Sequence, residues 1–334
     1  MKSNRKIKII VPIILGILFA FSPIITPNLD FKNSDISDCV NLDNENLKNS
    51  ALSPPIHIDD TNPSMNWSVA KDTGICTGNG TYSKPYVIED LVIDGGGSVN
   101  CILIENSEVY FRIENCTLYN SSLAGIQLSN VKLSQLADNN CTTNFKGISL
   151  EFCYNNTISG NTVNYNNYFG ISLDESDYCM VAGNNLKYNP IGLYLSGSTY
   201  NTILGNNASY NGDNGITLYD SDNNNISGNT VNFNHDVGIF LYNCNNNTVS
   251  ENIVNNNEHG IYLWYSNDNK VSGNILLGND KCIVEDDDCH GNKFSDNGAC
   301  IYGQGGGIPG YKLFFLLAFF SVIVIILSKK AKKS

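Results

Sequence analysis

Glu151 and Asp174 are candidates for acid–base chemistry. Each follows the same four residues, Gly-Ile-Ser-Leu, and the two lie 23 residues apart. If they occupy equivalent positions in successive units of a stacked repeat, we expect their carboxyl groups to lie about 5 Å apart. Such a pair can raise the pKa of one partner and act on a glycosidic bond, or it can bind Ca²⁺. The alternative is a solvated acidic surface, and the sequence leaves both interpretations open.

A run of three acidic residues, Asp286, Asp287 and Asp288, is a second candidate site. Carboxylate oxygens are the ligands that Ca²⁺ prefers, so this run can hold that ion. The alternative is a solvated loop near the end of the repeats. Apart from this possible Ca²⁺, no cofactor is expected.

Aromatic residues recur at two equivalent positions in the second half of the chain. If these positions face outward, they form a stripe about four units long, and aromatic faces suit sugar rings or other flat partners. The alternative is the ordinary preference of aromatic residues for strands. The candidate ligand-binding residues are Tyr194, Tyr219, Phe240, Tyr242, Tyr262 and Trp264.

A repeat of 22 or 23 residues must position all these side chains. A unit of this length with three short strand-like runs cannot bury its own apolar side chains, but stacked units can. Residues one and three places after the repeat glycine are apolar and face inward, so those two and four places after it face outward. The glycines that begin each Gly-(Ile/Leu)-x-Leu motif are Gly125, Gly147, Gly170, Gly192, Gly215, Gly238 and Gly260.

Asparagine is the other repeated residue, with 52 copies in 334 residues. It is a poor helix former, so long helices are not expected in the middle of the chain. We expect Asn at left-handed turns, with side-chain amides bonded to the amides above and below in structural ladders. The first ladder is Asn139, Asn161, Asn184, Asn206, Asn229, Asn252 and Asn274. The second is Asn144, Asn166, Asn189, Asn211, Asn234 and Asn256.

Serine and cysteine share one further repeat position. Cys153 and Cys244 take the place of Ser176, Ser198, Ser221 and Ser266, which predicts a small buried polar ladder. Cys153 and Cys244 cannot bond to each other, because four units separate them. A disulfide among Cys282, Cys289 and Cys300 is one expectation, and a Cys76–Cys101 pair is a weaker one.

These signatures resemble a known family. Gly-Ile-x-Leu and Asn-Thr-Ile-Ser-Gly-Asn-Thr look like right-handed parallel β-helix repeats of the pectin-lyase-like superfamily, including NosD-like, carbohydrate-binding and sugar-hydrolase proteins. Residues 78–94 resemble the entry segment of archaeal and bacterial surface β-helices. Residues 308–334 look like a C-terminal surface-sorting signal. The resemblance covers residues 75–334 and implies the fold more than the function.

The resemblance also suggests two chemistries. Lyases of this fold use an Arg or Lys base beside Ca²⁺, but the only Arg beyond the N-terminal segment is Arg112. NosD-like proteins suggest copper-site maturation, which needs His, Met or Cys clusters. His235 and His259 are close in repeat phase, but we expect surface turns there and interpret the NosD likeness as a shared fold.

The whole chain is therefore predicted to be an all-β, right-handed parallel β-helix of about nine coils of 22–24 residues, plus terminal membrane segments. The expected parts are a signal peptide or signal anchor (1–26), a linker (27–52) and an N-terminal cap or entry segment (53–100). They continue with the β-helix (101–303), a Gly-rich linker (304–311), a transmembrane helix (312–328) and a basic cytoplasmic tail (329–334). Trp67 and Tyr82 are candidate packing residues of the cap.

Charge and export signals constrain the partners. Nine of the 20 basic residues lie at the two ends, which leaves 11 basic against 32 acidic residues, a net charge of −21, between them. Such a surface repels phosphate backbones, so no nucleic acid is expected as a partner. The basic n-region and the C-terminal apolar run predict an exported, single-pass, membrane-anchored protein with the β-helix outside the cell. Exposed sequons at Asn155, Asn225 and Asn246 are candidate glycosylation sites.

Three functions follow in order of preference. The first is a cell-surface binding or structural module that recognises carbohydrate or another surface polymer, with surface proteins as other possible partners. The second is a polysaccharide lyase or hydrolase that uses Glu151 and Asp174. The third is a NosD-like copper-site maturation factor. The sequence leans against an enzyme.

Overall fold

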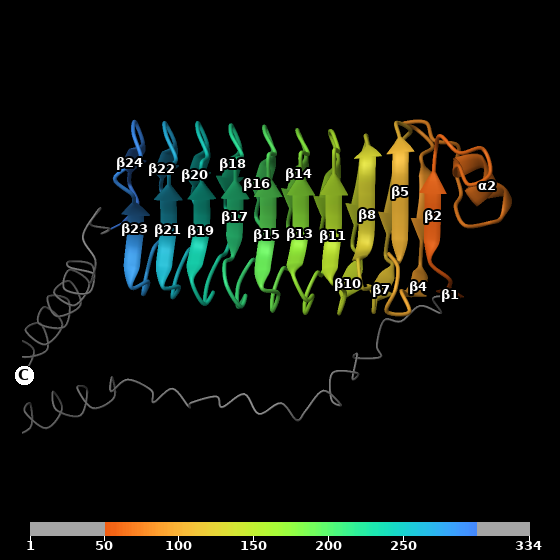
Figure 1. Cartoon of the computed structure of the whole chain (residues 1–334), viewed down its shortest axis with the longest axis horizontal. Helices are drawn as coiled ribbons and strands as arrows, with labels where there is room; N and C mark the ends of the chain where they lie inside the picture. The colour runs from red at the N-terminus through yellow and green to blue at the C-terminus, as the bar shows by residue number, and fades with distance from the viewer. Residues whose placement is uncertain (1–50, 299–334) are drawn as a thin grey trace, which may run out of the picture. The chain divides into compact units, whose positions relative to one another are not determined.

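A computed structural model describes residues 51–298 (Figure 1). The predicted signal segment (1–26), the Gly-rich linker (304–311), the membrane helix (312–328), the basic tail (329–334) and nearly all of the 27–52 linker lie outside these residues. No helix in the described range has the length and apolar character needed to cross a membrane.

The described residues form a β-helix in which strands of successive coils pair in parallel (Figure 1). The first ten-stranded sheet contains β2 (Ile56–Asp59), β5 (Ile102–Ser107), β8 (Ala124–Val131), β11 (Lys146–Glu151), β13 (Phe169–Asp174), β15 (Ile191–Ser196), β17 (Ile216–Tyr219), β19 (Val237–Tyr242), β21 (His259–Trp264) and β23 (Lys281–Glu285). The nine strands from β5 onward correspond to the predicted number of coils.

The second ten-stranded sheet runs along another side of each coil. It contains β3 (Tyr86–Glu89), β6 (Phe111–Glu114), β9 (Ser134–Ala137), β12 (Thr157–Ser159), β14 (Met180–Ala182), β16 (Thr202–Leu204), β18 (Asn225–Ser227), β20 (Thr248–Ser250), β22 (Lys270–Ser272) and β24 (Lys293–Ser295). The third sheet is shorter, with β1 (Ala51–Ser53), β4 (Leu91–Asp94), β7 (Thr117–Tyr119) and β10 (Asn140–Thr142). It continues to Ile275 as single bridges between coils.

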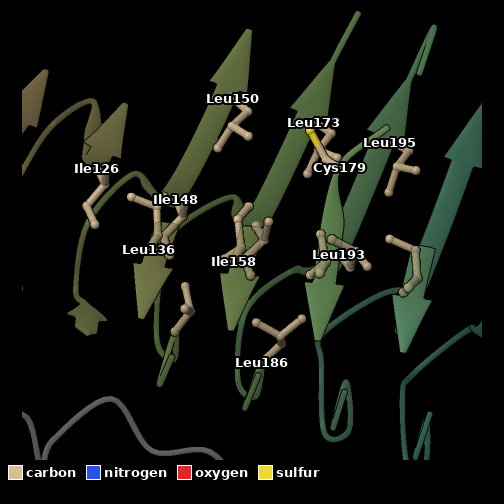
Figure 2. Packing of buried hydrophobic residues seen from close by; sticks show 14 of the residues in the cluster. Ile126, Leu136, Ile148, Leu150, Ile158, Leu173, Cys179, Leu186, Leu193 and Leu195 are labelled. Carbon is tan, nitrogen blue, oxygen red and sulfur yellow. The ribbon is translucent and has the colours of Figure 1, made fainter. Parts of the chain in front are cut away.

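Stacked aliphatic side chains fill the interior (Figure 2). Ile126, Ile148 and Ile171 are strand-paired neighbours, and each is fully buried. Burial of such side chains is the main stabilising contribution of each coil, about 1.5–3 kcal/mol per residue. As predicted, residues one and three places after the repeat glycine face this interior.

The repeat glycines leave room for the neighbouring coil. A Cβ atom built on Gly238 lies 2.3 Å from Val254 Cγ1 and 2.6 Å from the Gly260 carbonyl oxygen. Both distances are shorter than any van der Waals contact. Glycine is therefore required at this position because the backbone of the next coil and a buried side chain occupy the space.

Asparagine ladders run along the molecule. The Asn161 backbone N–H and Nδ2 both donate to Asn184 Oδ1, at 2.9 Å, while Nδ2 also donates to the Leu136 carbonyl oxygen. The same bonds recur from coil to coil, and they satisfy backbone groups where the chain turns. The first ladder contains Asn139, Asn161, Asn184, Asn206, Asn229, Asn252, Asn274 and Asn297.

The prediction that Asn256 belongs to the second ladder was wrong. Asn234 donates to Oδ1 of Asn257, whereas Asn256 is an exposed corner residue with φ 57°. The ladder position lies five residues after Asn252, and an Asn256 side chain would point out of the coil. The ladder contains Asn144, Asn166, Asn189, Asn211, Asn234, Asn257 and Asn279.

The left-handed residues are also not the ladder asparagines. Each bend is made one residue earlier, by Tyr165, Tyr188, Tyr210 and Phe233 before the second ladder, with φ from 58° to 62°. The bend at this residue lets the following asparagine turn inward. The corner rings stack outside the coil, with centroids 4.8 Å apart for Tyr165 and Tyr188. A second exposed stack, Tyr154, Tyr178 and Tyr200, follows another corner.

The Ser/Cys position forms a continuous buried ladder. The Cys153 N–H donates to Ser176 Oγ at 3.0 Å, and the Ser221 N–H donates to Cys244 Sγ at 3.4 Å. Cys289 extends the ladder as acceptor for Ser266. A further Asn ladder that the sequence analysis did not identify contains Asn201, Asn224, Asn247, Asn269 and Asn292.

The N-terminal end is covered by a short helix, α2 (Trp67–Asp72) (Figure 1). Asn66 caps the helix by accepting from the Val69 N–H. Trp67 is buried, with its ring centroid 5.0 Å from that of Tyr86, and its Nε1 donates to Ser107 Oγ. Tyr82, the other predicted packing residue, is instead 81% exposed.

Candidate functional site

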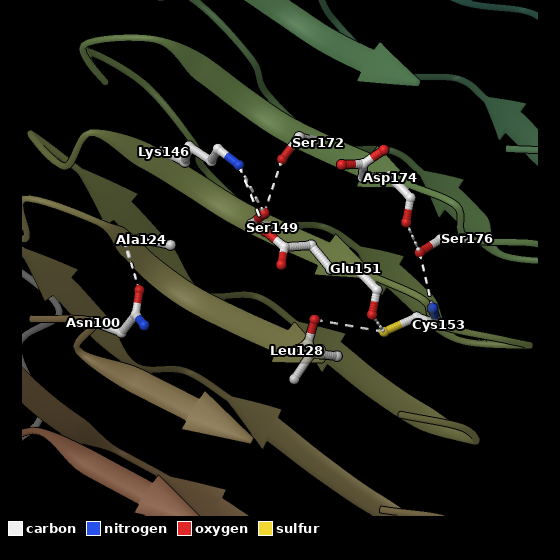
Figure 3. Close-up of polar contacts among 10 residues, drawn as sticks. All are labelled: Asn100, Ala124, Leu128, Lys146, Ser149, Glu151, Cys153, Ser172, Asp174 and Ser176. Atoms are coloured by element: carbon white, nitrogen blue, oxygen red, sulfur yellow. Dashed lines mark hydrogen bonds and ion pairs between the residues drawn. The ribbon is translucent and has the colours of Figure 1, made fainter. Parts of the chain in front are cut away.

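The acidic pair lies on the outer face of the first sheet. Glu151 and Asp174 are Cα partners across β11 and β13, so the two carboxylates come from adjacent coils. The Glu151 carboxylate is turned toward Lys146, whose Nζ lies 3.8 Å away (Figure 3). Asp174 is exposed.

Two serines beside this pair are more buried than strand alternation predicts. Ser149 and Ser172 were expected to face outward, yet both are buried, and their hydroxyls are 3.0 Å apart (Figure 3). The Lys146 ammonium donates to Ser149 Oγ, so a side chain from the start of the same strand, β11, contacts this hydroxyl. Arg112, the only candidate arginine base, lies on β6 of the second sheet and forms an ion pair with Glu114.

The aromatic residues gather on the same sheet nearer the C-terminal end. Tyr219, Tyr242 and Trp264 are consecutive cross-strand partners, and Phe240 pairs with Tyr262 beside them. The Tyr219 and Tyr242 rings stack at 4.8 Å, whereas Trp264 meets Tyr242 edge-on at 5.3 Å. Tyr219 and Trp264 are 40% and 37% exposed. We call Tyr219, Phe240, Tyr242, Tyr262, Trp264 and Tyr265 the aromatic face.

Tyr265 joins this face without having been predicted, and Tyr194 is separate from it. Tyr265 stacks on Trp264, with centroids 5.7 Å apart, from the corner after β21. Tyr194 stacks on Phe169 at 4.4 Å and is half-buried, and burial raises the pKa of its phenol. The buried Thr217 separates Tyr194 from Phe240.

One group of potential metal ligands lies next to the aromatic face. One ligand atom from each of Asp236, Glu258 and His259 lies within 4.8 Å of the other two. The His259 ring is 5.5 Å from that of Tyr262. In the preceding coil, burial and then the Asp236 charge raise the pKa of Asp213. His235, which the sequence analysis paired with His259, is exposed and does not belong to this group.

The predicted Ca²⁺ run lies in the loop after β23. Asp286, Asp287 and Asp288 form no group of ligand atoms within 4.8 Å, and the Asp287 N–H instead bonds to Asp286 Oδ1. The Asp286 carboxylate thus accepts a hydrogen bond from its own loop. Asn155, Asn225 and Asn246, the candidate glycosylation residues, are all exposed.

The cysteines serve packing roles in most coils. Burial raises the pKa of Cys101, Cys153 and Cys244 to about 12, so these thiols stay protonated and unreactive near neutral pH. Cys282 is disulfide-bonded, whereas Cys289 is a free thiol. The prediction of a Cys76–Cys101 disulfide was wrong, because both thiols are free.

Comparison with known families identifies the repeat. The family model described as "right handed beta helix region" matches residues 73–189 and 100–252, which together exceed half of the chain. The chain belongs to this right-handed β-helix family. A second model, described as "periplasmic copper-binding protein (NosD)", matches residues 200–306 of the β-helix. A comparison with curated proteins finds no match.

Solved structures similar to this β-helix include two modules from Azotobacter vinelandii. The A-module of mannuronan C-5 epimerase AlgE4 is 13% identical, with a TM-score of 0.53 over 78% of this chain and 90% of that one. The A-module of AlgE6 is 14% identical, with a TM-score of 0.50 over 76% and 87%. At these identities the likeness shows the fold alone.

The group of His, Cys, Asp and Glu ligands found among residues 51–298 does not have the donor set of a cuprous copper site. Soft Cu(I) sites use thiolate, thioether or several imidazole ligands. Between residues 51 and 298, the one group of ligands contains a single imidazole, two carboxylates and no sulfur. The free thiols are divided among separate coils and are mostly buried.

Proposed function

We propose that this chain is an exported, cell-surface β-helix that binds carbohydrate, or a polymer of similar chemistry, through the aromatic face. The observation that carries the proposal is the continuous column Tyr219–Tyr242–Trp264 with Phe240 and Tyr262 beside it. Packing of the core does not require aromatic residues on the outer side of the sheet. An exposed, contiguous aromatic surface is typical of a binding site.

The geometry suits an extended ligand. Strand pairing holds successive aromatic residues about 4.8 Å apart along the molecule. Trp264 meets Tyr242 edge-on and has the Tyr262 and Tyr265 rings nearly parallel to its indole, yet it remains 37% exposed, so part of the indole is open to a ligand. A sugar ring can pack on such a surface with its C–H groups, while tyrosine hydroxyls provide hydrogen bonds.

Two observations support export and a polymeric ligand. The NosD family is described as periplasmic, and its model matches this chain over residues 200–306. The similar AlgE4 module acts on mannuronan, a polysaccharide, by its name. The C-terminal apolar segment at 312–328 remains our proposed membrane anchor, with the β-helix outside the cell.

A polysaccharide lyase or hydrolase is the second candidate. The in-register pairing of Glu151 with Asp174 favours it. Glu151 and Asp174 lie three and two coils from Tyr219, the nearest residue of the aromatic face, however, and Lys146 lies within ion-pair distance of Glu151. The NosD-like copper role is the third candidate, and the one group of His, Cys, Asp and Glu ligands found among the described residues lacks the sulfur ligands that Cu(I) prefers.

The test is a panel of neutral and acidic polysaccharides incubated with the purified full chain. Retention and new reducing ends or unsaturated products are both measured. We expect retention without products, and weaker retention for Trp264→Ala. The control, Tyr188→Ala, removes a corner aromatic of similar exposure and should retain wild-type binding. Products that disappear in Glu151→Gln or Asp174→Asn would replace the binding role with the enzymatic one.

A further inference from the structure

The start of strands β19 and β21 brings three metal-ligating side chains together. Asp236 directly precedes Val237, and Glu258 directly precedes His259, while Val237 and His259 are Cα partners. Asp236 and Glu258 therefore face each other across the coils. The His259 N–H donates to the Asp236 carbonyl oxygen at 3.0 Å, which fixes this register.

The imidazole in this group is held in place. The His259 side chain is 11% exposed, and its Nδ1 lies 3.2 Å from Asp236 Oδ1. Its ring also packs against that of Tyr262. The histidine is thus fixed by a carboxylate on one side and an aromatic ring on another. A fixed imidazole loses little conformational freedom when it coordinates an ion.

Among the described residues, the imidazole of His259 is the only basic group that contacts the carboxylates of this group. In the part of the chain that the structure describes, no lysine or arginine forms an ion pair with Asp236 or Glu258. Two neighbouring carboxylates repel each other unless a proton or cation lies between them. The group also contains a nitrogen ligand, which distinguishes it from an ordinary acidic surface.

We propose that Asp236, Glu258 and His259 bind a divalent cation of the zinc type. Imidazole nitrogen and carboxylate oxygen are both ligands of Zn²⁺, and the ion is often held by three protein ligands. The spacing of the three ligand atoms, within 4.8 Å of one another, fits coordination to one ion. Ca²⁺ prefers six to eight oxygen ligands, and Cu(I) prefers sulfur, so both fit less well.

Three protein ligands leave at least one coordination position open. The His259 ring packs against Tyr262, so the site borders the aromatic face. The metal site does not depend on the proposed carbohydrate role, because metal binding is measured without a polymer. If both are present, an oxygen of the polymer can occupy the open position.

The test is a calorimetric titration of Zn²⁺ into the metal-free full chain. Absorption of bound Co²⁺ reports the ligand set. We expect one Zn²⁺ per chain and an affinity at least ~10-fold lower in Glu258→Gln and in His259→Ala. Glu258 is exposed, so its substitution tests the site without disturbing the core. His235→Ala, which removes a neighbouring exposed imidazole, is the matched control and should bind as the wild type does.

Several results would overturn the site. One is the absence of Zn²⁺ binding by the wild-type chain. A second is wild-type affinity in both Glu258→Gln and His259→Ala, which would place the ion elsewhere. A third is tighter binding of Ca²⁺ than of Zn²⁺ with no effect of His259→Ala, which would exclude the imidazole as a ligand.

Discussion

Single residues in the ladders show where sequence reasoning is precise and where it fails. The 22- and 23-residue steps predict which asparagines stack, and nearly every member lies where the period places it. Asn256 and Asn257 are neighbours of the same type, and the constant spacing of five residues from the first ladder selects Asn257. The backbone bend at Asn256 gives the same assignment.

The buried thiols give a prediction about pH. Their pKa values are raised by burial, to about 12 for Cys153 and Cys244. The folded chain therefore keeps protons that the unfolded chain releases above about pH 9, so these thiols favour folding fully below pH 9 and less as pH rises toward 12. We expect Cys153→Ser plus Cys244→Ser to reduce the loss of unfolding free energy between pH 8 and pH 10.5, measured by denaturant titration.

A matched control comes from another coil position. Serine already occupies the equivalent ladder position at Ser176. The double variant Cys153→Ser plus Cys244→Ser should therefore lose little unfolding free energy at pH 8. Cys141 lies in an apolar column and has no ladder acceptor, and Cys141→Ser should cost about 1–3 kcal/mol. Identical pH dependence in the wild type and the paired variant would exclude the thiols as the cause.

At the scale of elements, the repeat glycine predicts the strands well. Strands β11, β13, β15, β19 and β21 contain Gly-(Ile/Leu)-x-Leu, and their register follows from the period. The stacked corner aromatics were not predicted, because tyrosine rarely adopts a left-handed backbone. The burial of Ser149 and Ser172 was missed for a different reason, since strand alternation does not predict the contact of Lys146 with Ser149 or the bond between the two serine hydroxyls.

The close approach of coils at these glycines gives a second prediction. Gly238→Ala places a methyl group within 2.3 Å of Val254 Cγ1 and 2.6 Å of a backbone oxygen, so β19 must move away from β21. We expect a loss of about 1–3 kcal/mol or more in unfolding free energy, measured with urea. Gly212→Ala is the control, because its Cβ meets only ordinary contacts at 3.7 Å and beyond. Equal effects of the two variants would contradict the packing explanation.

The candidate sites could be predicted only where they follow strand alternation. The aromatic face does so, since Tyr219, Tyr242 and Trp264 share one repeat position. The group of Asp236, Glu258 and His259 does not, because it forms at a bend where side chains of two coils converge. The repeat spacing suggested that His235 and His259 lie close together. At the bend, however, the carboxylate of Asp236 contacts His259.

The whole molecule combines an acidic surface with two distinct regions on one sheet. The acidic pair at β11 and β13 lies toward the N-terminal half, and the aromatic face lies over β17, β19 and β21. Parallel pairing makes the sheet a regular support, so a polymer can extend along it across several coils. The central claim is that the aromatic face is where that polymer binds.

The two tryptophans allow a direct test, since Trp67 is buried under the cap while Trp264 is 37% exposed in the aromatic face. In Trp67→Phe, all tryptophan emission comes from Trp264. We would titrate this full-length variant with the best-retained polysaccharide and follow emission and iodide quenching. A saturable emission change with protection from iodide, at the affinity found by retention, is the expected result. Retained binding with unchanged Trp264 emission and quenching would contradict the account, because the polymer would then bind elsewhere.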